Sequence, residues 1–394
     1  MKTLPTLSRR ARWGIPAGAV ALAGALTAGT MISTAQASPE LPVRTPAQLL
    51  AAVAGRTAPL PALTGTVVET ASLGLPQLPG SADPNSVTAL LAGSHTIKIW
   101  YADPTHIRLA VPVTMSETDV IRNGRQGWVW QSSSNTVTRM QWPAREGQAA
   151  RPPAALPSQL PLTPQQAASQ ALKAVGPSTR VSVQRNVTVA GQPAYQLVLS
   201  PKAGGSLVGR VAIAIDATKN VPLRVQVFAK GAASPAFQVG YTSISFVKPA
   251  AANFRFAPPA GAKVKMVSPP RETSGPTSAR DKKANGEPQV IGKDWLSVAV
   301  LPASGLAGVM GAGSTSSMAG QAAQSAAGSP AGGSGEDAAV AAALLKTATP
   351  VHGAWGSGKL LHTSLVSVLM TSDGHVLVGA VTPAVLESAA AQIK

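Results

Sequence analysis

The segment closest to a catalytic motif is Gly353-Ala-Trp-Gly-Ser-Gly358-Lys359, which has the G-x-x-x-x-G-K spacing of a nucleotide-binding P-loop. In such a loop the backbone amides hold phosphates, and a Ser or Thr after the lysine holds magnesium. Leu360 stands at that position, and the residues after it alternate like a strand, whereas a P-loop leads into a helix. We therefore predict a glycine-rich turn that leads into a hairpin.

Histidines are the other residues suited to acid–base or metal chemistry, and the five are dispersed: His95, His106, His352, His362 and His375. Asp103 is the one carboxylate expected near His95 or His106, and Asp103-Pro104 predicts a turn. The sequence has no G-x-S-x-G, H-E-x-x-H or G-x-G-x-x-G pattern and no cysteine. We therefore predict no enzyme activity, no metal site and no cofactor, with His95 and His106 at turn and edge-strand positions.

The first 37 residues have the layout of an export signal. Four basic residues and no acid stand at the start, and residues 13–32 carry no charge. Ala35-Gln36-Ala37 then offers a small-x-small cleavage site after Ala37. An uncharged run of about 20 residues is also long enough to span a bilayer. Two interpretations stay open, a cleaved signal peptide and a retained membrane anchor, and both predict a protein outside the cytoplasm, at or tethered to the plasma membrane.

The net charge is +17, yet charged residues make up only 12% of the chain. After residue 37 the lysines and arginines are scattered, without the dense run that is typical of nucleic-acid binding. This balance predicts a solvated basic surface that favours an anionic membrane surface, and no nucleic-acid partner.

Short alternating segments dominate residues 38–267 and predict an antiparallel meander. Two helices are expected, over 45–56 and 163–176, each opened by Thr-Pro. Asn123-Gly124 and Ala190-Gly191 predict tight hairpin turns. Eleven strands are predicted: 64–72, 94–101, 105–112, 117–123, 126–132, 136–142, 180–189, 193–200, 207–216, 221–230 and 236–247.

A second, smaller α+β domain is predicted over 289–394, after a linker at 268–288 that is rich in Pro, Ser and Lys. Residues 302–336 are rich in Gly, Ala and Ser, which predicts a low-complexity insertion. The expected elements of this domain are a strand at 294–301, a helix at 338–347, a hairpin of 360–371 with 375–381, and a final helix at 384–393.

Four segments of residues 45–267 resemble the LolA-like superfamily of envelope proteins, which includes outer-membrane lipoprotein carriers and the RseB/MucB sensors. The resemblance is carried by four features: an opening strand, an Asn-Gly hairpin with Trp-x-Trp, an Ile-Asp…Pro-Leu-Arg pair, and a short Pro-containing segment at the end of the domain. The segments are Leu63–Glu69, Val120–Trp130 continuing to Asn135–Arg139, Ile215-Asp216 with Val221–Arg224, and Phe256–Gly261. Asp294–Leu301 and Gly374–Pro383 resemble the small second domain of RseB/MucB.

The resemblance implies a mainly β fold: a curved, incomplete antiparallel barrel of about eleven strands with covering helices, whose cavity holds acyl chains. Trp128 and Trp130 share one face of their strand, and the residues predicted to line the cavity are Trp100, Trp128, Trp130, Ile213 and Val225. Core packing without a ligand is the alternative for these side chains.

Two functions follow from the resemblance. The first is a non-enzymatic binder or carrier of lipid or lipoprotein acyl chains in the cell envelope. The second is a regulator like RseB/MucB that binds an anti-sigma factor during envelope stress. A carrier needs only the first domain, whereas a sensor uses both.

Overall fold

The structure is a computed structural model that describes residues 39–54, 59–74, 92–113, 115–141, 161–173, 175–267, 289–302 and 347–393. The predicted export signal with Ala37, the linker at 268–288, residues 303–336 of the insertion and the helix at 338–347 except Thr347 lie outside these ranges. Within them, no helix is both long and apolar enough to cross a membrane.

Twelve strands form one open sheet in the order β12-β6-β5-β4-β3-β2-β1-β11-β10-β9-β8-β7. Eleven of them are the predicted strands, joined antiparallel, and the twelfth pairs parallel with β6. The prediction of a mainly β, incomplete barrel is therefore confirmed. The strands are β1 (Leu63–Ser72), β2 (Ala92–Asp103), β3 (His106–Val113), β4 (Ser116–Asn123), β5 (Gln126–Gln131), β6 (Thr136–Gln141), β7 (Thr179–Val189), β8 (Gln192–Pro201), β9 (Val208–Asp216), β10 (Pro222–Ala229), β11 (Phe237–Ser245) and β12 (Lys263–Val267).

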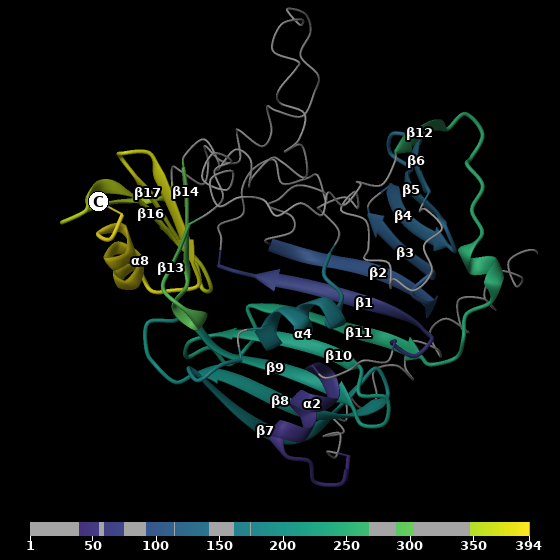
Figure 1. Cartoon of the computed structure of the whole chain (residues 1–394), viewed down its shortest axis with the longest axis horizontal. Coiled ribbons are helices and arrows are strands. Elements are labelled where there is room, and N and C mark those ends of the chain that lie inside the picture. The colour runs from purple at the N-terminus through teal and green to yellow at the C-terminus, as the bar shows by residue number, and fades with distance from the viewer. Residues whose placement is uncertain are drawn as a thin grey trace, which may run out of the picture. The chain divides into compact units, whose positions relative to one another are not determined.

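Tight turns and irregular pairings give the sheet its bend (Figure 1). Ala190 and Gly191 both have positive φ, as the two central residues of a type I′ hairpin turn require. The β1–β11 register shifts between Thr66 and Val67, and such a bulge increases the local twist. The curl is strong enough that β7 contacts β11, four strands away in the sheet order, while β7 and β12 remain its two ends.

The two faces of this sheet differ, because residues directly opposite in neighbouring strands share a face. One face, here called the tryptophan face, includes a row across six strands: Thr64, Trp100, Arg108, Ile121, Trp128 and Arg139. The other face is covered by helices and holds the main apolar core. Val67 pairs with Ile97 on that face, and Val239 pairs with Val225, which pairs with Ile213.

Two short helices cover the core: α2 (Pro46–Ala54) and α4 (Pro164–Lys173). Both begin with a reciprocal pair of hydrogen bonds between a Thr and a Gln three residues later. In α4, the Gln166 backbone N–H donates to Thr163 Oγ1 at 3.3 Å, and the Thr163 N–H donates to Gln166 Oε1 at 2.9 Å. These capping boxes fix where each helix starts, as the Thr-Pro pattern predicted. Figure 1 shows α4 beside β10 and β11, which it contacts.

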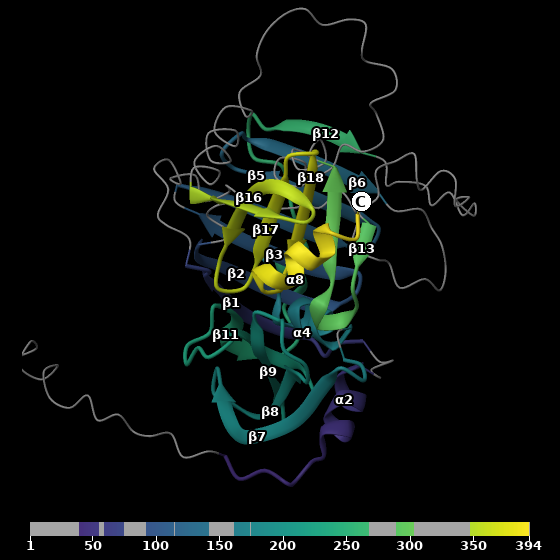
Figure 2. The same cartoon turned by 90° about the vertical axis from the view of Figure 1, so that its left-hand side faces the viewer.

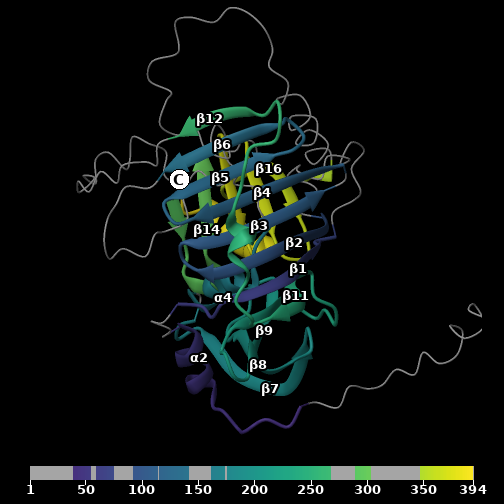
Figure 3. The ribbon, with the colours of Figure 1, turned by 90° about the vertical axis from the view of Figure 1, so that its right-hand side faces the viewer.

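A segment from β11 to β12 crosses the tryptophan face (Figure 3). Its 3₁₀ helix η1 (Ala251–Phe254) contacts β3 and β4. The chain then reaches β12, which runs parallel to β6. This strand was not predicted, because every one of its residues is exposed and no half-buried alternation marks it.

Six further strands form a second sheet in the order β13-β14-β18-β17-β16-β15, with α8 (Pro383–Ala390) against β17 and β18 (Figure 2). Its core is a separate cluster that includes Trp355, Leu369, Leu377 and Leu386. The strands are β13 (Gln289–Ile291), β14 (Val298–Pro302), β15 (Thr349–Gly353), β16 (Gly356–His362), β17 (Ser367–Thr371) and β18 (His375–Gly379).

Three predictions for this region are tested by its elements. The strand predicted over 294–301 is present as β14, but its predicted start was wrong, because Asp294–Leu296 forms the 3₁₀ helix η2, with Asp294 at φ +53°. The single strand expected at 360–371 is two strands, β16 and β17, because the Thr363 hydroxyl accepts the Val366 N–H and holds a turn. The segment with P-loop spacing forms the turn of the β15–β16 hairpin, as predicted from its glycine content.

Candidate functional site

Four polar side chains lie on the helix-covered face near the start of α4: Glu69, His95, Gln165 and Tyr241. Glu69 of β1 lies directly opposite His95 of β2, and these residues are only 5% and 8% exposed. Tyr241 of β11 is opposite Val67, two residues from Glu69. Strand register therefore gathers an acid, an imidazole and a phenol within an otherwise apolar face.

This polar group holds the start of α4. The Leu162 backbone N–H donates to Glu69 Oε2 at 2.6 Å. Gln165 Nε2 donates to Tyr241 Oη at 3.1 Å and to the Pro222 carbonyl at 3.4 Å. Three hydrogen bonds, to Glu69 of β1, Tyr241 of β11 and the Pro222 carbonyl of β10, thus fasten the start of the helix.

Burial dominates the electrostatics of the group. It raises the pKa of Glu69 above its ordinary value, and the Leu162 amide and the interaction with His95 offset only part of that effect. Burial also raises the pKa of Tyr241 to about 12, against a smaller lowering by its hydrogen bond with Gln165. In both groups burial thus shifts the equilibrium toward the neutral form, relative to the same side chain in water.

Sequence reasoning missed this arrangement. Asp103 was the one carboxylate expected near His95 or His106, yet Glu69 is the residue opposite His95. The expectation of an edge-strand position for His95 was also wrong, because β2 lies inside the sheet. The two residues are far apart in sequence, and only the β1–β2 register brings them together.

The surroundings of this group are apolar. The core cluster on the helix-covered face draws on β1 to β3 and β7 to β11. The side chains of Ile213 and Val225, two of the predicted cavity residues, are 0% and 1% exposed there. The residues that α4 buries are Pro164, Ala167 and Ala168, and its Leu172 packs partly buried against the same cluster. Because its fully buried side chains are small and Leu172 is only partly buried, α4 contributes less apolar area to this core than the strands do.

The other three predicted cavity residues, Trp100, Trp128 and Trp130, lie on the opposite face of the sheet. Register shows this directly, since Trp100 and Trp128 belong to the same cross-strand row and Trp130 is two residues further along β5. The five residues predicted to share a cavity therefore divide into two sets, separated by the thickness of the sheet.

Trp128 and Trp130 are covered by the segment that leads to β12. The Phe256 ring centroid lies 6.0 Å from that of Trp128 and 6.5 Å from that of Trp130. Together with Ile121, Val137 and Ala262 these rings form a small apolar cluster of their own. The segment acts as a strap over β4 to β6.

A charged pair lies beside this cluster. Arg108 Nη2 is 2.5 Å from Asp119 Oδ2, and the Asp119 residue is 1% exposed. The Arg108 guanidinium is also 5.4 Å from the Trp100 ring centroid, within the range of a cation–π contact. The pair orders the tryptophan face and offers no free acid for chemistry.

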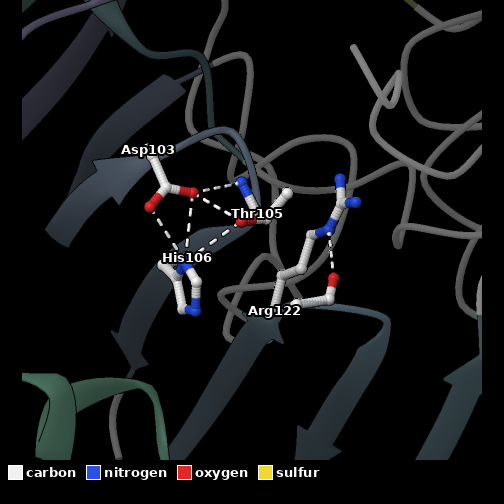
Figure 4. A network of polar contacts seen from close by, with 5 residues as sticks. Asp103, Thr105, His106 and Arg122 are labelled. Carbon is white, nitrogen blue, oxygen red and sulfur yellow. Dashed lines mark hydrogen bonds and ion pairs between the residues drawn. The ribbon is translucent and has the colours of Figure 1, made fainter. Parts of the chain in front are cut away.

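A third polar group is the network at the β2–β3 turn (Figure 4). His106 Nδ1 is 2.9 Å from Asp103 Oδ2, and the Thr105 hydroxyl donates to Asp103 Oδ1 at 2.6 Å. Burial acts to raise the pKa of Asp103, but the bonds from Thr105 and His106 outweigh it, so that pKa is lowered. The turn that Asp103-Pro104 predicted is present, and it explains why these residues cluster. Among the residues that the structure describes, no three His, Cys, Asp or Glu side chains are placed to hold a metal ion.

The two sheets are joined through backbone and side-chain hydrogen bonds. The Leu207 N–H donates to the Ala380 carbonyl at 2.9 Å, and the Thr382 N–H donates to the Gly205 carbonyl at 2.8 Å. Trp295 Nε1 donates to Thr179 Oγ1 at 2.7 Å. Gly205 has φ +95°, and a Cβ there would lie 3.0 Å from a Val385 methyl, so a larger residue would disturb this junction.

Comparison with known proteins finds similarity in structure. The chain is similar to Pseudomonas aeruginosa MucB in a structure of the MucA/MucB complex, with 16% identity, 87% of this chain and 94% of that chain covered, and a TM-score of 0.37. A structure of MucB with MucA(peri) has 15% identity, coverage of 87% and 96%, and a TM-score of 0.40. A LolA superfamily protein from Nitrosomonas europaea has 9% identity, coverage of 54% and 99%, and a TM-score of 0.21.

No protein-family model matches the sequence, and no curated protein sequence matches it. The structures found include both groups that the sequence resembles, MucB and the LolA superfamily. At these identities the similarity is one of fold.

Proposed function

We propose that this chain is a non-enzymatic protein of the cell envelope that binds an acyl chain of a lipid or lipoprotein beneath α4. The observation that carries the proposal is the contrast on the helix-covered face. The strands present a broad apolar surface that includes Ile213 and Val225, whereas the fully buried side chains of α4 are the small ones of Pro164, Ala167 and Ala168, and its Leu172 packs there only partly buried. An acyl chain that takes the place of α4 would keep this surface out of water.

The polar contacts at the start of α4 suit a displaceable cover. Few bonds must break for the helix to move, and Tyr241 and Gln165 can then hydrogen-bond water or a lipid head group. On the proposed site, Ile213 and Val225 line the acyl chain. Trp100, Trp128 and Trp130 remain on the other face, where the strap covers two of them.

The first test asks whether lipid is present and whether α4 must move. The full chain is purified, extracted for lipid mass spectrometry, and incubated with a fluorescent fatty acid. Because the chain has no cysteine, Gln165→Cys with Tyr241→Cys can be bridged by a short bifunctional thiol reagent. We expect bridged protein to lose fatty-acid uptake, and each single variant treated with the same reagent to retain it. Protein that carries no lipid and takes up no fatty acid would contradict the proposal.

Location outside the cytoplasm, at or tethered to the plasma membrane, is part of the proposal. It is supported by the export layout of residues 1–37 and by the net charge of +17, which suits an anionic membrane surface. N-terminal sequencing of the mature protein tests cleavage after Ala37. A start at Ser38 allows a freely diffusing carrier, and a start at Met1 restricts the protein to local transfer.

A second candidate function is a regulator that binds a membrane protein such as an anti-sigma factor. The observation in its favour is the second sheet, which a carrier does not need and which is hydrogen-bonded to the first through Leu207 and Thr382. Cross-linking in cells followed by identification of partners tests this role. Recovery of lipid alone, with no membrane protein, would count against it.

A further inference from the structure

The strand β12 has one side that pairs with no other strand among the described residues. Lys263 donates its backbone N–H to the Asn135 carbonyl at 2.9 Å, so its backbone groups face β6. Backbone groups of successive residues in a strand point to alternate sides. Lys265 and Val267 therefore also face β6, and the N–H and C=O groups of Val264 and Met266 point to the free side.

The side chains at this edge combine apolar and basic character. All five residues of β12 are exposed; Val264 is 50% and Met266 is 68% exposed. Lys263 and Lys265 alternate with them, and the whole stretch of residues 248–267 contains no Asp or Glu. Pairing with a second copy would place lysines near lysines, which disfavours self-association. Charge complementarity instead favours a strand that carries carboxylates.

We propose that the free side of β12 binds an extended, acidic peptide segment of a partner protein as an additional strand of the large sheet. The backbone groups of Val264 and Met266 supply the hydrogen bonds, as in other cases where a peptide extends a sheet. Lys263 and Lys265 select for carboxylates, and the exposed side chains of Val264 and Met266 pack against apolar residues that alternate with them.

The strap makes this edge a preformed template. Phe256 packs on Trp128 and Trp130, and Asn135 Nδ2 donates to the Ala260 carbonyl at 3.5 Å just before β12 begins. The strand is thus held on β6 before any partner arrives. Binding then requires ordering of the peptide but not of β12, which lowers the entropic cost of forming the complex.

The proposal is independent of acyl-chain binding, since Ile213 and Val225 lie in the core on the other face of the sheet. The probe is a short fluorescent peptide of alternating Glu and Val, compared with one of alternating Lys and Val by fluorescence anisotropy at low and high salt. We expect the full chain to bind the acidic peptide and to bind it less well as salt rises. Hydrogen exchange is expected to slow at the amides of Val264 and Met266.

Proline separates a backbone contact from a side-chain contact. Met266→Pro removes one N–H on the free side without removing a bond to β6, so the fold should be kept. We expect it to weaken peptide binding by roughly tenfold, whereas the matched variant Met266→Ala loses less. Lys263→Glu with Lys265→Glu should reverse the preference between the two peptides. Circular dichroism and thermal unfolding check that each variant is folded.

Several results would overturn the proposal. Equal peptide binding by M266P and M266A would exclude strand addition at this edge. If the β12 variants bound the acidic peptide as the unchanged chain does but bound phosphatidylglycerol vesicles less well, the edge would be a membrane contact instead. If the full chain sedimented as a dimer and M266P sedimented as a monomer, the free side of β12 would bind a second copy of this chain instead.

Discussion

Glu69 and His95 face each other across β1 and β2, and both are almost fully buried on the helix-covered face. Glu69 also accepts the Leu162 N–H at the start of α4. A titratable group thus lies at the junction between the sheet and the helix that we propose as its displaceable cover.

This placement predicts a pH dependence of stability. Burial raises the pKa of Glu69 above its ordinary value of 4.5. The folded state therefore binds this proton more tightly than the unfolded state, so the free energy of unfolding falls as pH rises from about 4.5 through the raised pKa. Glu69→Gln keeps an acceptor for Leu162 and should remove that fall. Urea unfolding between pH 4 and pH 7 measures it, with Glu40→Gln, an exposed glutamate, as control; an unchanged pH profile would refute the assignment.

The second prediction concerns Tyr241, whose pKa is raised to about 12 from an ordinary value of 10.0. The folded state again holds the proton more tightly, so stability should fall as pH rises between about 10 and 12. Tyr241→Phe should remove this alkaline loss and cost about 1 kcal/mol at neutral pH, because the bond with Gln165 is gone. Tyr195→Phe also loses a partly buried hydrogen bond, to the Pro42 carbonyl, but should keep the alkaline loss. The same loss in Y241F would contradict the prediction.

The third prediction tests the strap. Phe256→Ala should lower the free energy of unfolding by about 2 kcal/mol, because a half-buried ring leaves the cluster with Trp128 and Trp130. Tryptophan fluorescence should shift to longer wavelength as the two indoles meet water. The neighbouring exposed Arg255→Ala should change neither quantity. Emission unchanged in F256A would show that the strap does not cover these indoles in solution.

The fourth prediction concerns the ion pair of Arg108 and Asp119. Removing the arginine in Arg108→Met leaves a buried carboxylate without its partner, which should cost about 3–5 kcal/mol. Adding Asp119→Leu should recover much of that loss, since two apolar side chains can replace the pair. Lys98→Met, on an exposed position of the same face, should change stability by less than about 0.5 kcal/mol. A double variant as unstable as R108M would contradict this account.

Local sequence signals placed most of the elements. The eleven alternating segments became β1 to β11, and the Thr-Pro pairs became the starts of α2 and α4. These signals work because side-chain alternation and capping act over a few residues. The strand β12 carries no such signal, since neither of its faces is buried.

The sequence by itself determined the mainly β character, the succession of strands along the chain and the absence of recognisable catalytic motifs, because each depends on residue types within short windows. The tertiary structure decided which distant residues meet. It placed Glu69 opposite His95, put Ile213 and Val225 on the face away from the three tryptophans, and left the edge of β12 free. Strand register and the bend of the sheet set these relationships, and both arise from long-range pairing that no local pattern encodes.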